Sequence, residues 1–205
     1  MVGIVDFAMG NLRSVVNALE FLGAKVMLCK NPEDLKGVER ILLPGVGAFH
    51  ECMKNLKAKD FPGALDDEVR RLGKPIMGIC LGMQAMARRS FEGGEHAGLG
   101  WIDADVVRLR PAEQSLRVPH VGWNVIAYRQ DFPLFSGLPQ FPDFYFVHSY
   151  HLKCADERDV VATCDYGGTV TVSICRDNIF ATQFHPEKSQ DFGLKLLRNF
   201  LKWNP

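Results

Sequence analysis

The apolar positions in the first half of the chain come in short runs that alternate with amphipathic segments. Four of these runs have the length of a buried strand: residues 2–7, 25–29, 40–45 and 74–79. Helical periodicity falls between and after them, in residues 11–23, 49–57, 63–73 and 81–89. In the first of these segments Leu12, Val15 and Leu19 share one face. Alternation of this kind predicts parallel βαβ units whose sheet is covered by helices on both faces.

The second half of the chain changes to strand-like segments separated by turns. They are residues 104–110, 122–129, 144–154, 159–168, 170–177 and 178–186. Asp177 and Asn178 tolerate positive φ, so we expect a hairpin turn there. Residues 189–205 return to a helical pattern with Ser189 as its predicted N-cap. The sequence therefore predicts one α/β domain over residues 1–205, with a mostly parallel sheet flanked by helices and an antiparallel β portion in its second half.

Composition limits the partners, the compartment and the state of the cysteines that we expect for this protein. The 205 residues include 24 Lys and Arg and 24 Asp and Glu, so charge gives no reason to expect nucleic acid or an anionic membrane as a partner. No apolar run reaches 18 residues and the start lacks the basic region of a signal peptide, so we expect a cytoplasmic protein. The six cysteines are dispersed without a C-x-x-C pair, which favours reduced thiols over disulfides or a zinc site.

One cysteine stands out because glycines flank it at a strand-to-helix turn. Gly78, Cys80 and Gly82 form G-x-C-x-G, the cysteine version of a nucleophile elbow. Such a sharp turn needs small residues on either side, and it projects the central side chain above the sheet. The N-terminus of the next helix would favour the thiolate, and the backbone N–H of Leu81 would point toward a developing oxyanion. This motif alone leaves a buried structural cysteine as the alternative.

Two further motifs supply what a nucleophilic cysteine needs. His185 and Glu187 are two residues apart at the predicted end of a strand, where their side chains would share a face and the carboxylate would fix the imidazole tautomer. Gly45 and Gly47, in P-G-V-G after the third strand, let backbone N–H groups approach a substrate or turn toward an oxyanion. A phosphate-binding loop is the competing interpretation, but neither of the usual glycine patterns is present.

An H-x-x-H pair, His148 and His151, can indicate a metal site. On a strand this spacing places the two side chains on opposite faces, and no third ligand is clustered with them in the sequence. We therefore expect no metal.

Together the three motifs around Cys80 resemble those of the class I, triad-type glutamine amidotransferases. Residues 78–84 (GICLGMQ) match the nucleophile turn of that family, 44–47 (PGVG) its oxyanion strand and 185–187 (HPE) the rest of its triad. The resemblance implies a flavodoxin-like α/β fold, L-glutamine as substrate, no cofactor and a triad of Cys80, His185 and Glu187. It also implies residues that bind glutamine or its oxyanion: Gly45, Val46, Gly47, Leu81, Gln84, Ser149 and Tyr150.

Further segments are similar to the glutaminase subunits of imidazole glycerol phosphate synthases, a family of histidine biosynthesis. They are DFAMGNLRSV (6–15), VPHVGWN (118–124), FYFVHSY (144–150) and FHPEKS (184–189). Phe7 and Val121 stand where that family usually has Tyr and Met, and both changes are conservative. The resemblance implies a (β/α)8-barrel cyclase subunit as partner in a heterodimer. The residues we expect at that interface are Asn11, Trp123, Tyr145 and Lys188.

The chemistry of the product also favours a partner. Free ammonia is quickly protonated in water, and we expect a chain of 205 residues to hold one catalytic domain, so a second subunit must use the ammonia. Two alternatives stay open: the glutaminase subunit of another biosynthetic amidotransferase, and a stand-alone cysteine hydrolase.

Overall fold

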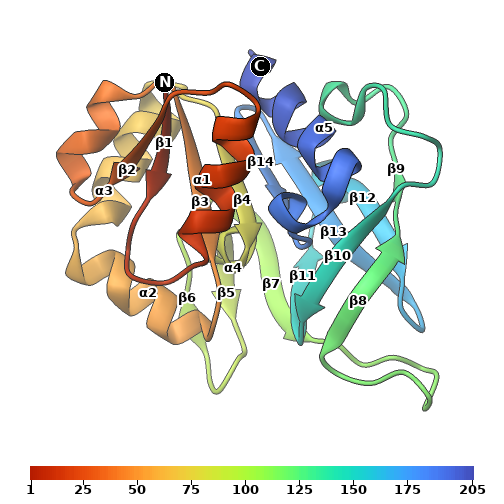
Figure 1. Cartoon of the computed structure of the whole chain (residues 1–205). Helices are drawn as coiled ribbons and strands as arrows, with labels where there is room; N and C mark the ends of the chain where they lie inside the picture. Colours follow the sequence, from red (N-terminus) through yellow and green to blue (C-terminus); the bar gives the residue numbers. More distant parts are fainter.

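The computed structural model describes residues 1–205, and one twelve-stranded sheet runs through both halves of the chain (Figure 1). The elements of the first half are β1 (Val2–Val5), α1 (Leu12–Phe21), β2 (Val26–Cys29), β3 (Arg40–Gly45), α2 (Phe49–Ala58), α3 (Phe61–Leu65), β4 (Ile76–Cys80), α4 (Leu81–Ala85), β5 (Ala87–Ser90) and β6 (His96–Ala97). Those of the second half are β7 (Ile102–Arg108), β8 (His120–Val125), β9 (Ala127–Tyr128), β10 (Asp143–His148), β11 (Tyr150–Cys154), β12 (Val160–Asp165), β13 (Thr169–Arg176), β14 (Ile179–Thr182) and α5 (Gln190–Lys202).

The sheet is parallel where the sequence predicts βαβ units and antiparallel beyond them. Its strand order is β2-β1-β3-β4-β14-β13-β11-β7-β5-β6, with β12 beside β13 and β9 beside β12. Neighbours from β2 to β14 are parallel, and β14, β13, β11 and β7 pair antiparallel in turn. The predicted α/β fold with an antiparallel second portion is thus confirmed. β8 and β10 form a separate antiparallel pair.

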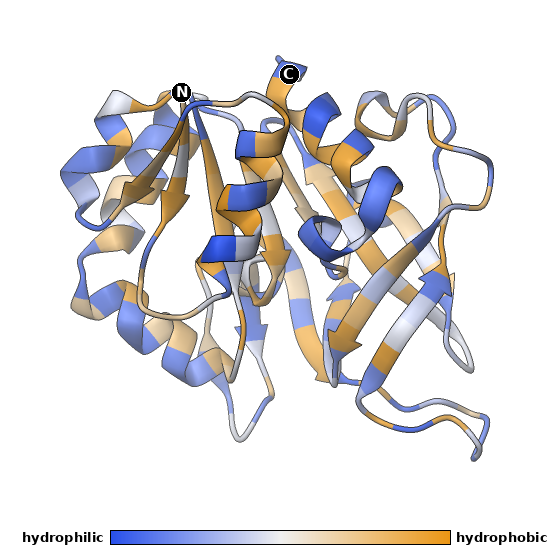
Figure 2. Cartoon of the chain, in the orientation of Figure 1, coloured by the Kyte–Doolittle hydropathy of each residue, from blue (hydrophilic) through white to orange (hydrophobic).

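Alternate residues of the central strands point into two different cores. In β3, Ile41 and Leu43 join a cluster with the apolar faces of α2, α3 and α4, whereas Leu42 joins a cluster with α1, α5 and β10. Figure 1 shows α1 and α5 together over one face of the sheet, and Figure 2 shows apolar strands with polar residues on the outer faces of the helices. Two buried faces explain why β1, β3 and β4 are apolar runs rather than alternating sequences.

Two local predictions are wrong for identifiable reasons, and a third is right in kind but differs in detail. The helix expected at 81–89 ends at Ala85, because the chain turns into β5, where Ala87 pairs with Ile102 and Arg89 forms ion pairs with Asp105 and Glu95. The segment 63–73 is helical as expected, but it consists of the end of α3 and a π-helical segment, Asp66–Arg71. Ser189 precedes α5 as predicted, but its side chain makes no N-cap hydrogen bond to that helix, because its Oγ bonds to the backbone of Tyr145 and His185 instead. The predicted hairpin turn is present, with Asp177 at φ 52°.

Candidate active site

Three neighbouring parallel strands end side by side at the centre of the sheet. In their registers Gly45 of β3 lies beside Cys80 of β4, and Thr182 of β14 lies beside Ile79. The residues that follow each strand therefore meet at one edge, which is where ligands bind in open α/β sheets. The sequence places P-G-V-G, the nucleophile turn and T-Q-F-H-P-E at these three ends.

Cys80 occupies a strained turn that only its glycine neighbours allow. Its backbone has φ 55° and ψ −108°, an unfavourable combination for a residue with a side chain. A Cβ at Gly82 would lie 1.7 Å from the carbonyl oxygen of Leu43, and one at Gly78 would lie 2.9 Å from the backbone nitrogen of Met83. Gly82 is therefore required for α4 to pack against β3 and Gly78 for α4 to pack against its own strand β4, and the predicted elbow is present.

His185 and Glu187 contact each other, although they do so in a turn and not on a strand. β14 ends at Thr182 and Pro186–Lys188 is a 3-10 turn, so the prediction that the two side chains share a strand face is wrong. The tight turn still brings Nδ1 of His185 within 2.7 Å of Oε1 of Glu187, and both side chains are almost fully buried, at 3% and 2% exposed. The buried Nε2 of His185 has no hydrogen-bond partner, which leaves it free to exchange a proton with a reactant.

Ser189 fixes the backbone around this histidine. Its Oγ donates to the carbonyl oxygen of His185 at 2.6 Å and accepts from the backbone N–H of Tyr145 at 3.0 Å. The N–H of His185 donates in turn to the carbonyl oxygen of Tyr145 at 3.0 Å. The backbone of His185 is thereby tied to β10 both directly and through Ser189, which restricts where its imidazole lies relative to Cys80.

The environment of His185 favours its protonated form. Burial alone would lower the pKa of His185, but its interactions with Cys80 and Glu187 outweigh burial and raise that pKa from 6.5 to about 9. Since the folded pKa is raised, the resulting stabilisation is complete below pH 6.5 and is lost as the pH rises through about 9.

A Glu187→Gln variant should therefore lower the pKa of His185 and reduce kcat for glutamine hydrolysis by about 10²–10⁴-fold. The amide keeps the shape of the carboxylate but removes the charge that stabilises imidazolium. NMR titration of the His185 ring measures the first effect. Urea unfolding between pH 6.5 and 9 should show a smaller loss of stability with pH than in the wild type. Glu157→Gln, on an exposed turn, is the matched control, and an unchanged His185 titration in Glu187→Gln would contradict the assignment.

A cavity of about 310 Å³ opens in front of Cys80 and His185. It is lined by six of the seven residues expected to bind glutamine or its oxyanion: Val46, Gly47, Leu81, Gln84, Ser149 and Tyr150. The seventh, Gly45, lies behind them as the strand partner of Cys80. Gly47 has φ 104°, which only glycine adopts readily, so this strand end can turn its peptide in a way other residues could not.

Four residues of this cavity are not predicted as site residues from the sequence, Glu92, Pro119, Val147 and His148, and two of them carry polar side chains. Glu92 lines it, with Oε2 accepting from the backbone N–H of Phe49 at the start of α2, at 2.8 Å. His148 also lines it, and its Nδ1 lies 2.9 Å from the carbonyl oxygen of Tyr150. Glu92 belongs to no motif recognised in the sequence. His148 lies in the segment 144–150 and in the H-x-x-H pair, but neither pattern predicts its place in this cavity.

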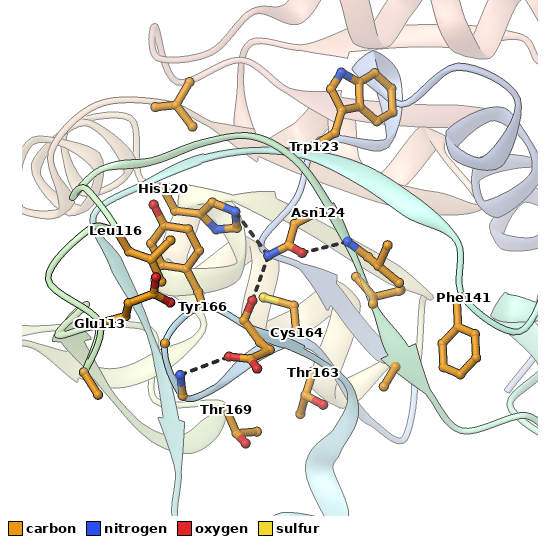
Figure 3. Close-up of a pocket in the computed structure, with 18 residues that line it drawn as sticks. Glu113, Leu116, His120, Trp123, Asn124, Phe141, Thr163, Cys164, Tyr166 and Thr169 are labelled. Carbon is orange, nitrogen blue, oxygen red and sulfur yellow. Dashed lines mark hydrogen bonds between the residues drawn. The ribbon is translucent and has the colours of Figure 1, made fainter.

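His148 connects the site to a second, larger cavity of about 950 Å³ beside β8 (Figure 3). Its Nε2 lies 3.1 Å from Nδ1 of His120, which lines that cavity, and Asn124 lies 3.4 Å from the other nitrogen of His120. Burial lowers the pKa of His120 to about 4 and that of His148 to about 3, so both rings are neutral at pH 7. Because the carbonyl oxygen of Tyr150 can only accept, the ring proton of His148 must be on its Nδ1. The Nε2 of His148 is then an acceptor, and Nδ1 of His120 must donate to it.

Three of the four predicted interface residues form one cluster. The rings of Trp123 and Tyr145 are 6.1 Å apart in an edge-on arrangement, and Nζ of Lys188 lies 5.8 Å from the centre of the Tyr145 ring. Trp123 is 45% exposed and is one of the residues that line the cavity of His120 (Figure 3). Asn11 is exposed immediately before α1 and makes no side-chain cap to that helix. The cluster lies directly next to the triad because Lys188 follows Glu187.

Comparison with known proteins agrees with this geometry. The family model for class-I glutamine amidotransferases matches residues 3–203. The chain therefore belongs to the class-I glutamine amidotransferase family. Two solved structures share the fold: a glutamine amidotransferase with a TM-score of 0.76 at 22% identity, and a chain in the structure of PurLQS from Thermotoga maritima with 0.75 at 18% identity. Each match covers 98% of this chain and 97% of the other.

Relatives with higher sequence identity are named as one particular kind of glutamine amidotransferase subunit. The chain is 48% identical over 202 residues to an imidazole glycerol phosphate synthase subunit HisH 1 of Campylobacter jejuni, which covers 98% of this chain and 100% of the relative. It is 46% identical over 209 residues to the subunit HisH of Zymomonas mobilis, which covers 100% of this chain and 96% of the relative. The second of these matches runs over the whole chain, including β8, β10 and the cluster of Trp123, Tyr145 and Lys188.

Proposed function

We propose that this protein is the glutaminase subunit of imidazole glycerol phosphate synthase, and that it hydrolyses glutamine to glutamate and ammonia for a cyclase subunit in histidine biosynthesis. The observation that carries the proposal is the meeting of an elbow cysteine, a buried His–Glu pair and a glycine-rich strand end around one cavity, in a chain similar to HisH subunits along its full length. Residues 1–205 act as one domain, which is supported by the single large sheet that joins both halves. No helix is long and apolar enough to cross a membrane, and we propose a cytoplasmic enzyme.

The reaction begins with Cys80. His185 takes the thiol proton first, as its raised pKa favours, and the thiolate Sγ then attacks the side-chain amide carbon of glutamine. His185 delivers that proton to the leaving ammonia. The C–N bond breaks and a glutamyl thioester remains on Cys80. His185 then takes a proton from a water that attacks the thioester, and glutamate leaves as the thiol is restored. Glu187 holds the tautomer and stabilises the imidazolium in both steps, as its 2.7 Å contact supports.

The cavity supplies groups that match glutamine. Val46, Gly47 and Leu81 line the cavity together with Cys80, and Gly45 is the strand partner of Cys80, which supports the backbone N–H groups of these residues as the oxyanion donors. The carboxylate of Glu92 suits the α-ammonium of an amino-acid substrate, and Ser149 and Tyr150 offer backbone groups for its α-carboxylate. Gln84 contributes its side-chain oxygen, since its NH2 group is already bonded within the protein.

The partner that we propose is a (β/α)8-barrel cyclase in a heterodimer. Val121, Trp123 and Val125 project from the same side of β8 and are 57%, 45% and 46% exposed, an apolar surface suited to protein contact. Trp123 with Tyr145 and Lys188 forms the part of that surface next to the triad, and Asn11 is its expected outer contact. A contact there can reach His185 through β10, because Tyr145 is bonded to both His185 and Ser189.

Glutamine hydrolysis measured with and without a barrel cyclase and its ligand tests the proposal. We expect low activity alone and a large rise in the complex, and equal rates would overturn the predicted dependence on a partner. Rescue of a histidine auxotroph separates this function from that of other amidotransferase subunits. A glutamine-analogue electrophile should label Cys80, and glutamine should block the labelling. Labelling that glutamine does not block would favour a stand-alone cysteine hydrolase.

A further inference from the structure

A buried set of side-chain amides leads from a backbone carbonyl to the nucleophile. Gln183 is fully buried, and its Nε2 lies 3.6 Å from Sγ of Cys80. Its Oε1 lies 2.9 Å from Nε2 of Gln84, and the same nitrogen of Gln84 lies 2.9 Å from the carbonyl oxygen of Tyr150. The triad does not include Gln183, although this residue contacts the reacting sulfur.

The direction of these hydrogen bonds is determined by the carbonyl of Tyr150. A carbonyl oxygen only accepts, so Gln84 must present its NH2 group to it, and rotating that amide by 180° would place two acceptors together. The second hydrogen of this NH2 group then points at Gln183, which must present its oxygen. The amide nitrogen of Gln183 is thereby directed at Sγ, and no other assignment satisfies every buried group.

We propose that Gln183 is a further catalytic residue of the glutaminase: its side-chain NH2 group donates to Sγ of Cys80 and stabilises the thiolate that attacks glutamine. This rests on the proposed role of Cys80 as nucleophile. A fixed donor favours the thiolate, which accepts strongly, over the thiol, which accepts weakly. The position of Gln183 is fixed at both its backbone and its side chain. Its backbone N–H donates to the carbonyl oxygen of Val172 at 2.9 Å, and its side chain is fully buried.

The charged and titratable groups around the sulfur come from three other elements. His185 follows β14, His148 ends β10, and Glu92 follows β5, and all three line the same cavity. His148 is neutral because burial lowers its pKa to about 3, so it adds no charge near pH 7. Gln183 therefore acts beside His185 as a neutral donor whose effect does not depend on pH.

The pH dependence of Cys80 alkylation tests this role. Iodoacetamide is applied to the full chain from pH 5 to 10, and modification of the Cys80 peptide is followed by mass spectrometry. Burial raises the pKa of the other five thiols to about 11 or about 12, so their labelling is slow in this range. In Gln183→Met the midpoint for Cys80 should move up by about one pH unit, and kcat for glutamine should fall about tenfold with KM changed less than about threefold.

Gln183→Glu is the sharper variant because it keeps an oxygen for Gln84 and replaces the donor to sulfur by a charged acceptor. Its midpoint should move up further than that of Gln183→Met, since a carboxylate would face the thiolate. An unchanged midpoint and kcat in Gln183→Glu would show that Gln183 only satisfies Gln84, and would overturn the proposal. Should neither variant fold, the side-chain ¹⁵NH2 signal of Gln183 in the wild type decides: it must shift as Cys80 ionises, and a signal that does not shift overturns the proposal.

These readouts separate the inference from the proposed function. The alkylation midpoint reports the contact between Gln183 and Cys80 whether or not the chain hydrolyses glutamine. A Cys80→Ala variant that retained full glutaminase activity would disprove the triad and leave the alkylation result unaffected.

Discussion

Cys80→Ala should abolish glutamine hydrolysis, lowering kcat by at least about a thousandfold, while ammonia-dependent synthesis by the complex continues. The nucleophile is lost and no other side chain in the cavity can form the thioester, so the reaction with glutamine has no alternative route. Synthesis from added ammonia should survive, because that step needs only a correctly shaped partner surface. Alanine is smaller than cysteine and leaves Gly78 and Gly82 in place, so the turn should keep its shape.

The measurement compares two activities of one purified complex: glutamate release from glutamine, and product formation with ammonium chloride. Cys175→Ala is the matched control, since Cys175 is half-buried on β13 and lines none of the site. Loss of both activities in Cys80→Ala would indicate a disturbed interface. Retention of glutamine hydrolysis would contradict the nucleophile assignment.

The sequence could predict the parts of the site that depend on a short local motif. Cys80 is recognisable because the glycines around it reflect a backbone conformation that only glycines permit. His185 and Glu187 are recognisable because they are only two positions apart, so that any tight turn brings their side chains together. Parallel strands then placed the three motifs together, since strand ends meet at one edge of the sheet. The prediction of a strand at His185 was wrong in detail, yet the contact that it was meant to explain is present.

The remaining parts of the site depend on contacts between distant segments. Gln183 reaches Gln84 across 99 residues of sequence and Cys80 across 103, and Glu92 reaches Phe49 across 43. No periodicity or local motif encodes such pairs. The same cause explains why the helix expected at 81–89 does not continue beyond Ala85. Pairing of β5 with β7 and the ion pairs of Arg89 override the local helical pattern there. Contacts between distant segments therefore explain both the wrongly predicted helix and the site residues that the sequence does not predict.

Gly82→Ala should destabilise the protein by at least about 3 kcal/mol and remove most of its glutaminase activity. The new Cβ would lie 1.7 Å from the carbonyl oxygen of Leu43, which is backbone of the central strand β3 and cannot move without disturbing its pairing with β4. α4 would have to shift away from the sheet, and Cys80, the residue just before it, would move with it. Stability and activity should thus fall together, unlike in Cys80→Ala.

Gly63→Ala provides the matched control for this effect, because Gly63 lies in α3 and a Cβ added there would meet no other atom within 4 Å. That change should leave stability unaltered or raise it by about 0.4–1 kcal/mol, since alanine restricts the unfolded chain more than glycine does. Urea unfolding of both variants gives the two free energies directly. If Gly82→Ala were as stable as Gly63→Ala, the close packing of α4 on β3 would not be what holds the elbow. The strained backbone of Cys80 would then need another source of support than the contact between these two elements.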